Sequence, residues 1–183
     1  IHKKQETLGE PRSGRNFHVY CSANNIGAKE LMTEVQQARS PALNSLVVTS
    51  NINQLALSEC MLVYLNSKTW SSGSISSDLA VEIEGAMTRK VRLLLAHEMT
   101  GGIHQAERFG CLFEQMFARE NGTPAHLIKA GIYAQIAVPL KGQEFRKVSM
   151  VLLQHSLLEE PAMLKVDDYI KAARGAHVLP AAA

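Results

Sequence analysis

The sequence has no feature of a membrane-spanning or nucleic-acid-binding protein. Its longest apolar runs fall far short of the ~20 residues that a helix needs to cross a bilayer. Its 19 basic and 17 acidic residues leave a formal net charge of +2, and no basic block of the kind that grips a phosphate backbone occurs. We therefore expect neither a nucleic-acid partner nor direct insertion into a membrane.

Cysteine is scarce, and its pattern indicates free thiols. Cys21, Cys60 and Cys111 are odd in number, widely spaced and embedded in apolar segments, where a free thiol behaves as a small hydrophobe. The simplest interpretation is a reducing compartment, which predicts a cytoplasmic location. In such a compartment the glycosylation pattern at residues 121–123 is merely a turn.

The chain begins with Ile1, and no charged-then-apolar leader follows it. We interpret it as a module of a longer protein, whose other domains are expected partners. Its 183 residues, 46% hydrophobic and 20% charged, predict one globular domain. We expect a flexible lead-in over residues 1–16, the domain over 17–160, and a C-terminal extension and tail over 161–183, with a short helix at 163–173.

Strand-like and helix-like segments alternate along the domain. Short aliphatic and β-branched runs predict strands at residues 17–22, 43–50, 60–65, 91–96 and 132–140. Helical spacing of apolar residues predicts helices at 28–38, 79–87 (capped by 76–78), 106–117 and 145–158, the last marked by Phe145, Val148 and Leu152. This alternation predicts an α/β sandwich of three layers around a five-stranded parallel sheet. The expected core includes Leu62, Val63, Leu93, Leu95 and Ile136.

Ligands of open parallel sheets bind beyond the carboxyl ends of the strands, so the loops that leave the strands are the candidate site. The loop at residues 22–27 has neither GxGxxG nor GxxxxGK(S/T), so it is not a familiar nucleotide loop. Ser22, Asn24 and Asn25 can still donate hydrogen bonds to a ribose or phosphate at the helix N-terminus. The alternative is a helix cap and turn.

His97 and Glu98 begin like the zinc-binding pattern HExxH, but the second histidine is missing. Position 101 is glycine, and His104 lies beyond a Gly-Gly pair. Because three N or S ligands are the usual minimum for zinc, we predict no metal site.

Glu82 is the most informative carboxylate in the sequence. It adjoins the apolar Ile83 at the margin of a helical stripe, whereas Glu84 points away from that stripe. We expect Glu82 to be half-covered and Glu84 to be solvated. Asp78 lies one turn earlier on the same face, and like charges at this spacing repel each other by a few tenths of a kcal/mol. The alternative is a surface helix with an acidic first turn.

Taken in order, these segments resemble the Toll/interleukin receptor/resistance (TIR) domain family. The resemblance rests on FHVYCS, GAKELMTEV, LSECMLVYLNSKTW, SSDLAVEIEGAM and VRLLLAHE, and it extends from about residue 17 to 158. It implies a flavodoxin-like, TIR-like sheet. The sequence departs from the family in a short loop at 49–54 without an Arg-Asp and Pro-Gly signature. It also has Asp78 where the family often has tryptophan, four residues before the glutamate.

The resemblance implies one of two functions. In TIR domains that cleave NAD the glutamate of this helix is catalytic, and the matching residue here is Glu82; NAD is then the substrate and no cofactor is implied. Other TIR domains are non-catalytic signalling or scaffold modules that self-associate or dock a partner. A third possibility, a flavodoxin-like regulatory domain, is disfavoured because the strand ends lack the paired aspartates of a phospho-receiver.

The chemistry required of Glu82 follows from the bond that would be cleaved. Cleavage of the nicotinamide–ribose bond passes through an oxocarbenium-like state, whose positive charge a nearby carboxylate stabilises without a metal. Trp70 is a candidate stacking face for a ring of the substrate. Tyr20 and Tyr64 are further candidates, but both lie within predicted strands, so the alternative is that they belong to the core. We expect Glu82 in a cleft bounded by residues 22–26 and 70–77.

Overall fold

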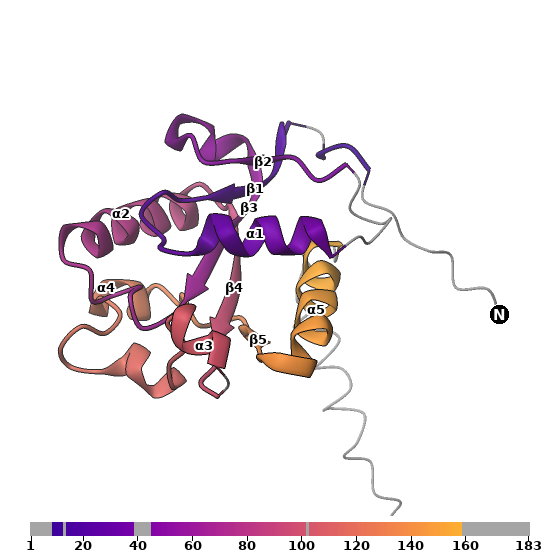
Figure 1. The fold of residues 1–183 in the computed structure, drawn as a ribbon. Helices are drawn as coiled ribbons and strands as arrows, with labels where there is room; N and C mark the ends of the chain where they lie inside the picture. Colours follow the sequence, from indigo (N-terminus) through magenta and orange to yellow (C-terminus); the bar gives the residue numbers. More distant parts are fainter. Residues whose placement is uncertain (1–8, 13, 39–44, 102, 159–183) are drawn as a thin grey trace, which may run out of the picture.

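A parallel sheet organises the protein. The computed structural model describes residues 9–12, 14–38, 45–101 and 103–158. The strands are β1 (Phe17–Cys21), β2 (Val48–Thr49), β3 (Ser58–Leu65), β4 (Arg92–Glu98) and β5 (Val138–Leu140). They form one five-stranded sheet in the order β2-β1-β3-β4-β5, and every neighbouring pair is parallel, as predicted (Figure 1).

Helices connect the strands and cover both faces of the sheet. They are α1 (Ala28–Gln37), α2 (Ser74–Thr88), α3 (Ile103–Glu107), α4 (Ala125–Lys129) and α5 (Arg146–Leu158), with 3-10 segments η2 (Ile52–Leu57), η3 (Phe113–Phe117) and η4 (Gln143–Phe145). Residues of α1 and α5 pack on one face, and residues of α2 and α4 pack on the other (Figure 1). No helix among the described residues has both the length and the apolar character needed to span a membrane.

The central strand β3 is buried on both faces. Its side chains facing α1 and α5 are Cys60, Leu62 and Tyr64. Those facing α2 are Met61, Val63 and Leu65. Because side chains alternate along a strand, a strand covered on both sides needs apolar residues at successive positions. This explains the uninterrupted apolar run that predicted the strand.

The three cysteines are buried and free. Burial raises the pKa of the Cys21 thiol to about 12. It likewise raises the pKa values of Cys60 and Cys111 to about 11. All three are therefore thiols rather than thiolates at neutral pH, and they act as small apolar groups in the core.

The predicted helix over residues 106–117 is wrong. α3 ends at Glu107, and Phe109 adopts a left-handed conformation with φ of 61°. The chain then returns to the end of β4, where the N–H of Cys111 donates to the carbonyl of Glu98 at 3.0 Å. Cys111 and Met116 thus reach the core from irregular backbone and a 3-10 segment rather than from one continuous helix.

The fifth strand is shorter than predicted. Only residues 138–140 pair with β4. Before them the chain forms a turn that begins at Gly131 (φ 84°), in which the N–H of Ala134 donates to the carbonyl of Gly131. Ile136 is 96% exposed, so its predicted place in the core is wrong. The other predicted core residues are buried: Leu62, Val63, Leu93 and Leu95.

Two further boundaries differ from the prediction. β2 spans only residues 48–49, and part of the predicted strand lies outside the described residues. α2 begins at Ser74, before the predicted cap, and the hydroxyl of Ser76 accepts the N–H of Ser72 at 2.9 Å. The helix predicted at 163–173 also lies outside the described residues.

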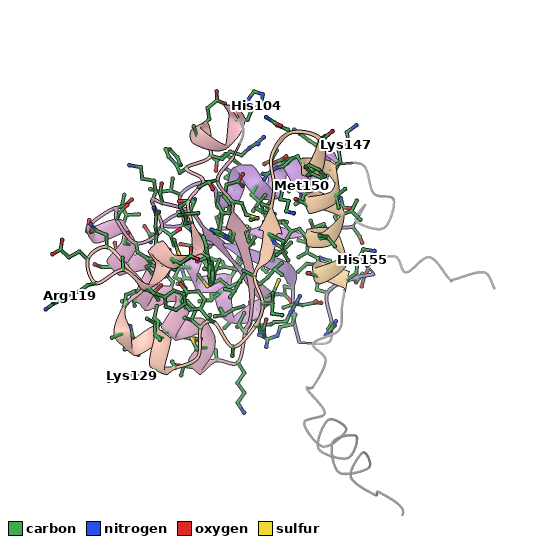
Figure 2. The ribbon with its side chains drawn as sticks, turned by 90° about the horizontal axis from the view of Figure 1, so that it is seen from below. His104, Arg119, Lys129, Lys147, Met150 and His155 are labelled. Carbon is green, nitrogen blue, oxygen red and sulfur yellow. The ribbon has the colours of Figure 1, made fainter. Side chains whose placement is uncertain are left out.

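α5 buries a face other than the predicted one. Phe145, Val148 and Leu152 are 55%, 57% and 45% exposed, so the stripe that predicted the helix faces outward. The buried residues are Arg146, Ser149, Met150, Leu153, Gln154 and Leu157. In Figure 2 this helix runs along one side of the molecule, with Lys147 and His155 on it and with Arg119 and Lys129 at the opposite side.

The polar residues on the buried face of α5 are all paired. Gln154 donates from Nε2 to the carbonyl of Val35 at 3.2 Å, and the hydroxyl of Ser149 accepts the N–H of Lys141 at 2.9 Å. Arg146 pairs with two glutamates, described below. Apolar spacing alone misplaced this face because three of its inward positions are polar.

Substitutions in the central strands test the assigned burial. We expect Leu62→Ala and Leu95→Ala each to lower the free energy of unfolding by about 2–5 kcal/mol, because each leaves a cavity in the core. Ile136→Ala is the control, with an expected change within about 0.5 kcal/mol because its side chain is exposed. Urea titrations measure all three, and equal losses at the buried and exposed positions would contradict the assignment.

Candidate functional site

The loops after β1 and β3 diverge at the carboxyl edge of the sheet. β1 leads into α1 on one face, whereas β3 leads into α2 on the other. In an open parallel sheet, this reversal in strand order creates the crevice in which ligands bind. The carboxyl edge between β1 and β3 is therefore the candidate site.

Glu82 on α2 is hydrogen-bonded to the carboxyl end of β1. The hydroxyl of Tyr20 donates to its Oε2 at 2.9 Å, and the amide Nδ2 of Asn24 donates to its Oε1 at 2.8 Å. Glu82 is half-buried and Glu84 is exposed, both as predicted. Within the described part of the chain, no basic side chain lies at ion-pair distance from Glu82.

Tyr20 and Asn24 orient the carboxylate without neutralising it. Burial, followed by the hydrogen bond and charge of Glu82, raises the pKa of Tyr20, so its hydroxyl stays protonated and donates. The amide of Asn24 is uncharged. A carboxylate offers about four acceptor positions, so two donors leave room for hydroxyl groups of a ligand.

The loop after β1 is built to present Asn24. The hydroxyl of Ser22 accepts the backbone N–H of Asn24 at 2.9 Å. Asn25 bridges to β3: its Nδ2 donates to the carbonyl of Tyr64 at 2.9 Å, and its Oδ1 accepts the N–H of Tyr64 at 2.7 Å. The side chains of Ser22 and Asn25 thus hold the loop, while that of Asn24 faces Glu82.

Gly27 lets α1 begin close to β3. Its φ is 85°, and a Cβ added there would lie 2.7 Å from Cε1 of Tyr64. Both the left-handed backbone and the close approach favour glycine at this position. The start of α1 and the loop before it are therefore fixed against the central strand.

No hydrogen bond or ion pair among the described residues joins Trp70 or Asp78 to Glu82. Trp70 is 6% exposed, packs in the core beneath α2 and borders a pocket of about 170 Å³. Asp78 is exposed on α2, one turn before Glu82. The predicted stacking role of Trp70 gains no support from its burial, and Glu82 does not line any of the three pockets described in this section and below.

A buried charge network, which no sequence pattern predicts, lies on the α1 face of the same edge. Arg146 donates from Nη1 to both carboxylate oxygens of Glu98, at 3.1 and 2.9 Å. It also donates from Nε and Nη2 to the two oxygens of Glu34, at 2.8 and 2.7 Å. The hydroxyl of Tyr64 donates to Glu98 at 2.8 Å. These residues come from four distant segments, so no local spacing reveals them.

The network borders a pocket of about 590 Å³ between α1 and the segment that follows α3. The pocket is lined by Ile26, Gly27, Glu30, Leu31, Thr33, Glu34, Gln37, Tyr64, Glu107, Arg108, Phe109 and Arg146. Arg108, the other arginine that lines the pocket, lies 3.9 Å from Glu34 through its Nη2.

The side chains of His97 and Glu98 both form hydrogen bonds within the protein. Nε2 of His97 donates to the carbonyl of Cys111 at 2.9 Å. Glu98 has no exposed surface and is bonded to Arg146 and Tyr64. Among the residues that the structure describes, no group of three or more His, Cys, Asp or Glu could hold a metal ion.

Comparison with known proteins found no match: no family model, no curated protein and no solved structure is similar to the chain.

The Glu34–Arg146 pair makes stability depend on pH. Burial alone would raise the pKa of Glu34, but the hydrogen bonds and charge of Arg146, with the charge of Arg108, hold it below its ordinary value. The native state therefore binds fewer protons at Glu34 than the unfolded state does. This contribution is complete above the unfolded pKa of about 4.3 and is lost as the pH falls through the lower native pKa.

We expect Glu34→Gln to lose less stability than the wild type when the pH falls from about 5 to about 3. Urea titrations across this range measure the difference. Glu30→Gln, an exposed position on the same helix, is the control and should follow the wild type. A Glu34→Gln profile parallel to that of the wild type would show that the pair makes no pH-dependent contribution.

Proposed function

We propose that this is a TIR-like domain that hydrolyses NAD at the nicotinamide–ribose bond, with Glu82 as its catalytic residue. The observation that carries the proposal is the Glu82 carboxylate, held by two neutral donors at the carboxyl edge between β1 and β3. Its place on the helix after the third strand supports the likeness to the TIR family. The strand order is also compatible with that likeness.

The reaction needs a fixed negative charge beside the ribose. The bond from ribose C1′ to the nicotinamide nitrogen breaks, and its electron pair stays on that nitrogen, which neutralises the ring cation. Positive charge then develops on C1′ and the ribose ring oxygen, and the Glu82 carboxylate stabilises it. Water adds to C1′ and loses a proton, giving nicotinamide and ADP-ribose.

The neighbours of Glu82 act as positioning residues in this proposal. Tyr20 and Asn24 hold the carboxylate in one orientation, so little reorganisation is needed as charge develops. Ser22 and Asn25 hold the loop that carries Asn24. In this proposal Asp78, exposed one turn before Glu82, adds negative charge near the ribose.

Glu82→Gln tests the catalytic role. We expect it to reduce NAD hydrolysis by at least about 100-fold, because the amide keeps the shape of the side chain but removes the charge. Glu84→Gln, on the exposed side of the same helix, is the matched control and should keep wild-type activity. Chromatography of nicotinamide and ADP-ribose measures turnover at low and high protein concentration, and thermal melting verifies that both variants fold.

Two outcomes would reject this function. Equal hydrolysis by the wild type and Glu82→Gln would remove Glu82 from the mechanism. No hydrolysis by the wild type at any protein concentration would leave the domain without the proposed activity.

A second candidate function is a non-catalytic interaction module that self-associates. The specific observation is the outward apolar face of α5 and η4: Phe145, Val148, Val151 and Leu152 are each 45–57% exposed. Contiguous exposed apolar residues mark interaction surfaces more often than scattered ones do. The net charge of +2 offers little repulsion between copies.

Light scattering over a wide concentration range tests this second function. We expect the mass of the wild type to rise with concentration and Val148→Asp to abolish the rise, because a charge on the apolar face cannot be buried without cost. Val81→Asp, a 68% exposed valine on α2, is the matched control and should behave as the wild type. A constant monomer mass for the wild type at the highest concentration would reject self-association.

A further inference from the structure

A third pocket lies at the β4–β5 edge of the sheet, apart from Glu82. Its volume is about 330 Å³. Its lining residues are His97, Phe113, Tyr133, Gln135, Ile136, Ala137 and Pro139. His97 follows Leu93 and Leu95 at alternate positions of β4, so it lies on the α2 face of the sheet. No lining residue is an acid, a lysine or an arginine.

Aromatic rings form the wall of this pocket. The ring of Phe113 lies 5.2 Å from that of His97 and 5.5 Å from that of Tyr133, both edge-on. The ring of Phe117 adjoins both, 5.7 Å from that of Phe113 and 5.2 Å from that of Tyr133. The hydroxyl of Tyr133 is hydrogen-bonded to that of Thr123, which fixes the ring. The wall is therefore apolar and held in place by its neighbours.

His97 supplies the single buried polar group that this wall leaves available. It is 7% exposed, and its Nε2 lies 2.9 Å from the carbonyl oxygen of Cys111. A carbonyl can only accept, so Nε2 carries the hydrogen. Burial lowers the pKa of His97, which keeps the ring neutral near pH 7. Nδ1 is then a bare acceptor.

The Nδ1 acceptor has no partner among the described residues. Nε2 makes the hydrogen bonds of this ring, and Nδ1 makes none there. In that part of the chain the buried side-chain nitrogen without a partner is Nε1 of Trp70, so Nδ1 of His97 is within reach of solvent. A buried ring nitrogen that is unbonded yet reachable requires a donor from outside the chain, either water or a ligand.

We propose that this pocket binds a small, uncharged, planar aromatic molecule that carries one N–H or O–H donor. Its ring would lie against Phe113 and Tyr133, and its donor would bond to Nδ1 of His97. A charged ligand is disfavoured because the lining offers no opposite charge to replace the lost hydration. Ile136, 96% exposed at this pocket, would cover the bound ring and lose contact with water.

The donor requirement gives the proposal a sharp test. Indole and 1-methylindole have nearly the same planar shape, but only indole has an N–H. We expect indole to bind the full chain saturably and 1-methylindole to bind about tenfold more weakly, because a ligand without the donor leaves Nδ1 unpaired. Nitrogen NMR of the imidazole should show indole shifting the Nδ1 resonance of His97, with little change at Nε2.

His97→Phe should bind both probes equally, because it keeps an aromatic ring but removes the acceptor. His104→Phe, an exposed histidine outside the pocket, is the control and should keep the preference for indole. If His97→Phe fails to fold, the comparison of the two probes on the wild type still decides. Equal affinities on the wild type, no binding of indole up to its solubility, or an unchanged Nδ1 resonance would each overturn the proposal. None of these measurements depends on NAD hydrolysis.

Discussion

The arrangement of α1, β4 and α5 depends on the two-sided pairing of Arg146. One guanidinium holds Glu98 at the end of β4 and Glu34 on α1, residues 48 and 112 positions away in the chain. Glu98 has no exposed surface, and an unpaired charge there would cost several kcal/mol. The side chain of Arg146 must therefore point toward the sheet, whichever other residues of α5 are buried. This one requirement sets the rotation of the helix, with the consequence that Val148 and Leu152 point outward.

Tyr64 connects this network to the candidate site on the other face of the sheet. Its hydroxyl donates to Glu98, while its backbone N–H and carbonyl bond to the side chain of Asn25. Asn25 belongs to the same tight loop as Asn24, whose amide holds Glu82. Hydrogen bonds, together with the covalent links through Tyr64 and from Asn25 to Asn24, thus connect α5 through the central strand to Glu82. The orientation of that carboxylate is set by packing of the whole sheet and not only by α2.

The sequence predicted well where one local pattern decided the structure. The apolar run of β3 and the stripe of α1 identified both elements, and the margin position of Glu82 predicted its half-burial. Prediction failed where residues distant in the sequence determine the structure. The inward face of α5 carries Arg146, whose partners lie on other elements. Ile136 is an aliphatic residue of the type found in cores, yet it is almost fully exposed. The hydrogen bond from Cys111 to the end of β4 belongs to tertiary structure, and no helical periodicity reveals it.

The three carboxylates at this edge differ in what holds them, and the difference bears on which one can do chemistry. Glu98 and Glu34 share the cation of Arg146, and Nη2 of Arg108 lies 3.9 Å from Glu34, so the two negative charges face two positive ones within the protein. Glu82 is held only by the neutral donors Tyr20 and Asn24, and no basic side chain among the described residues lies within ion-pair distance. The carboxylate of Glu82 is thus held in one orientation, and no neighbouring cation among the described residues neutralises its charge. A carboxylate that stabilises a developing cation needs both a fixed orientation and an uncompensated charge. A carboxylate neutralised by a neighbouring cation attracts the developing charge only weakly, and a mobile carboxylate must first reorganise. The geometry therefore favours Glu82 over Glu98, although Glu98 is the more deeply buried of the two.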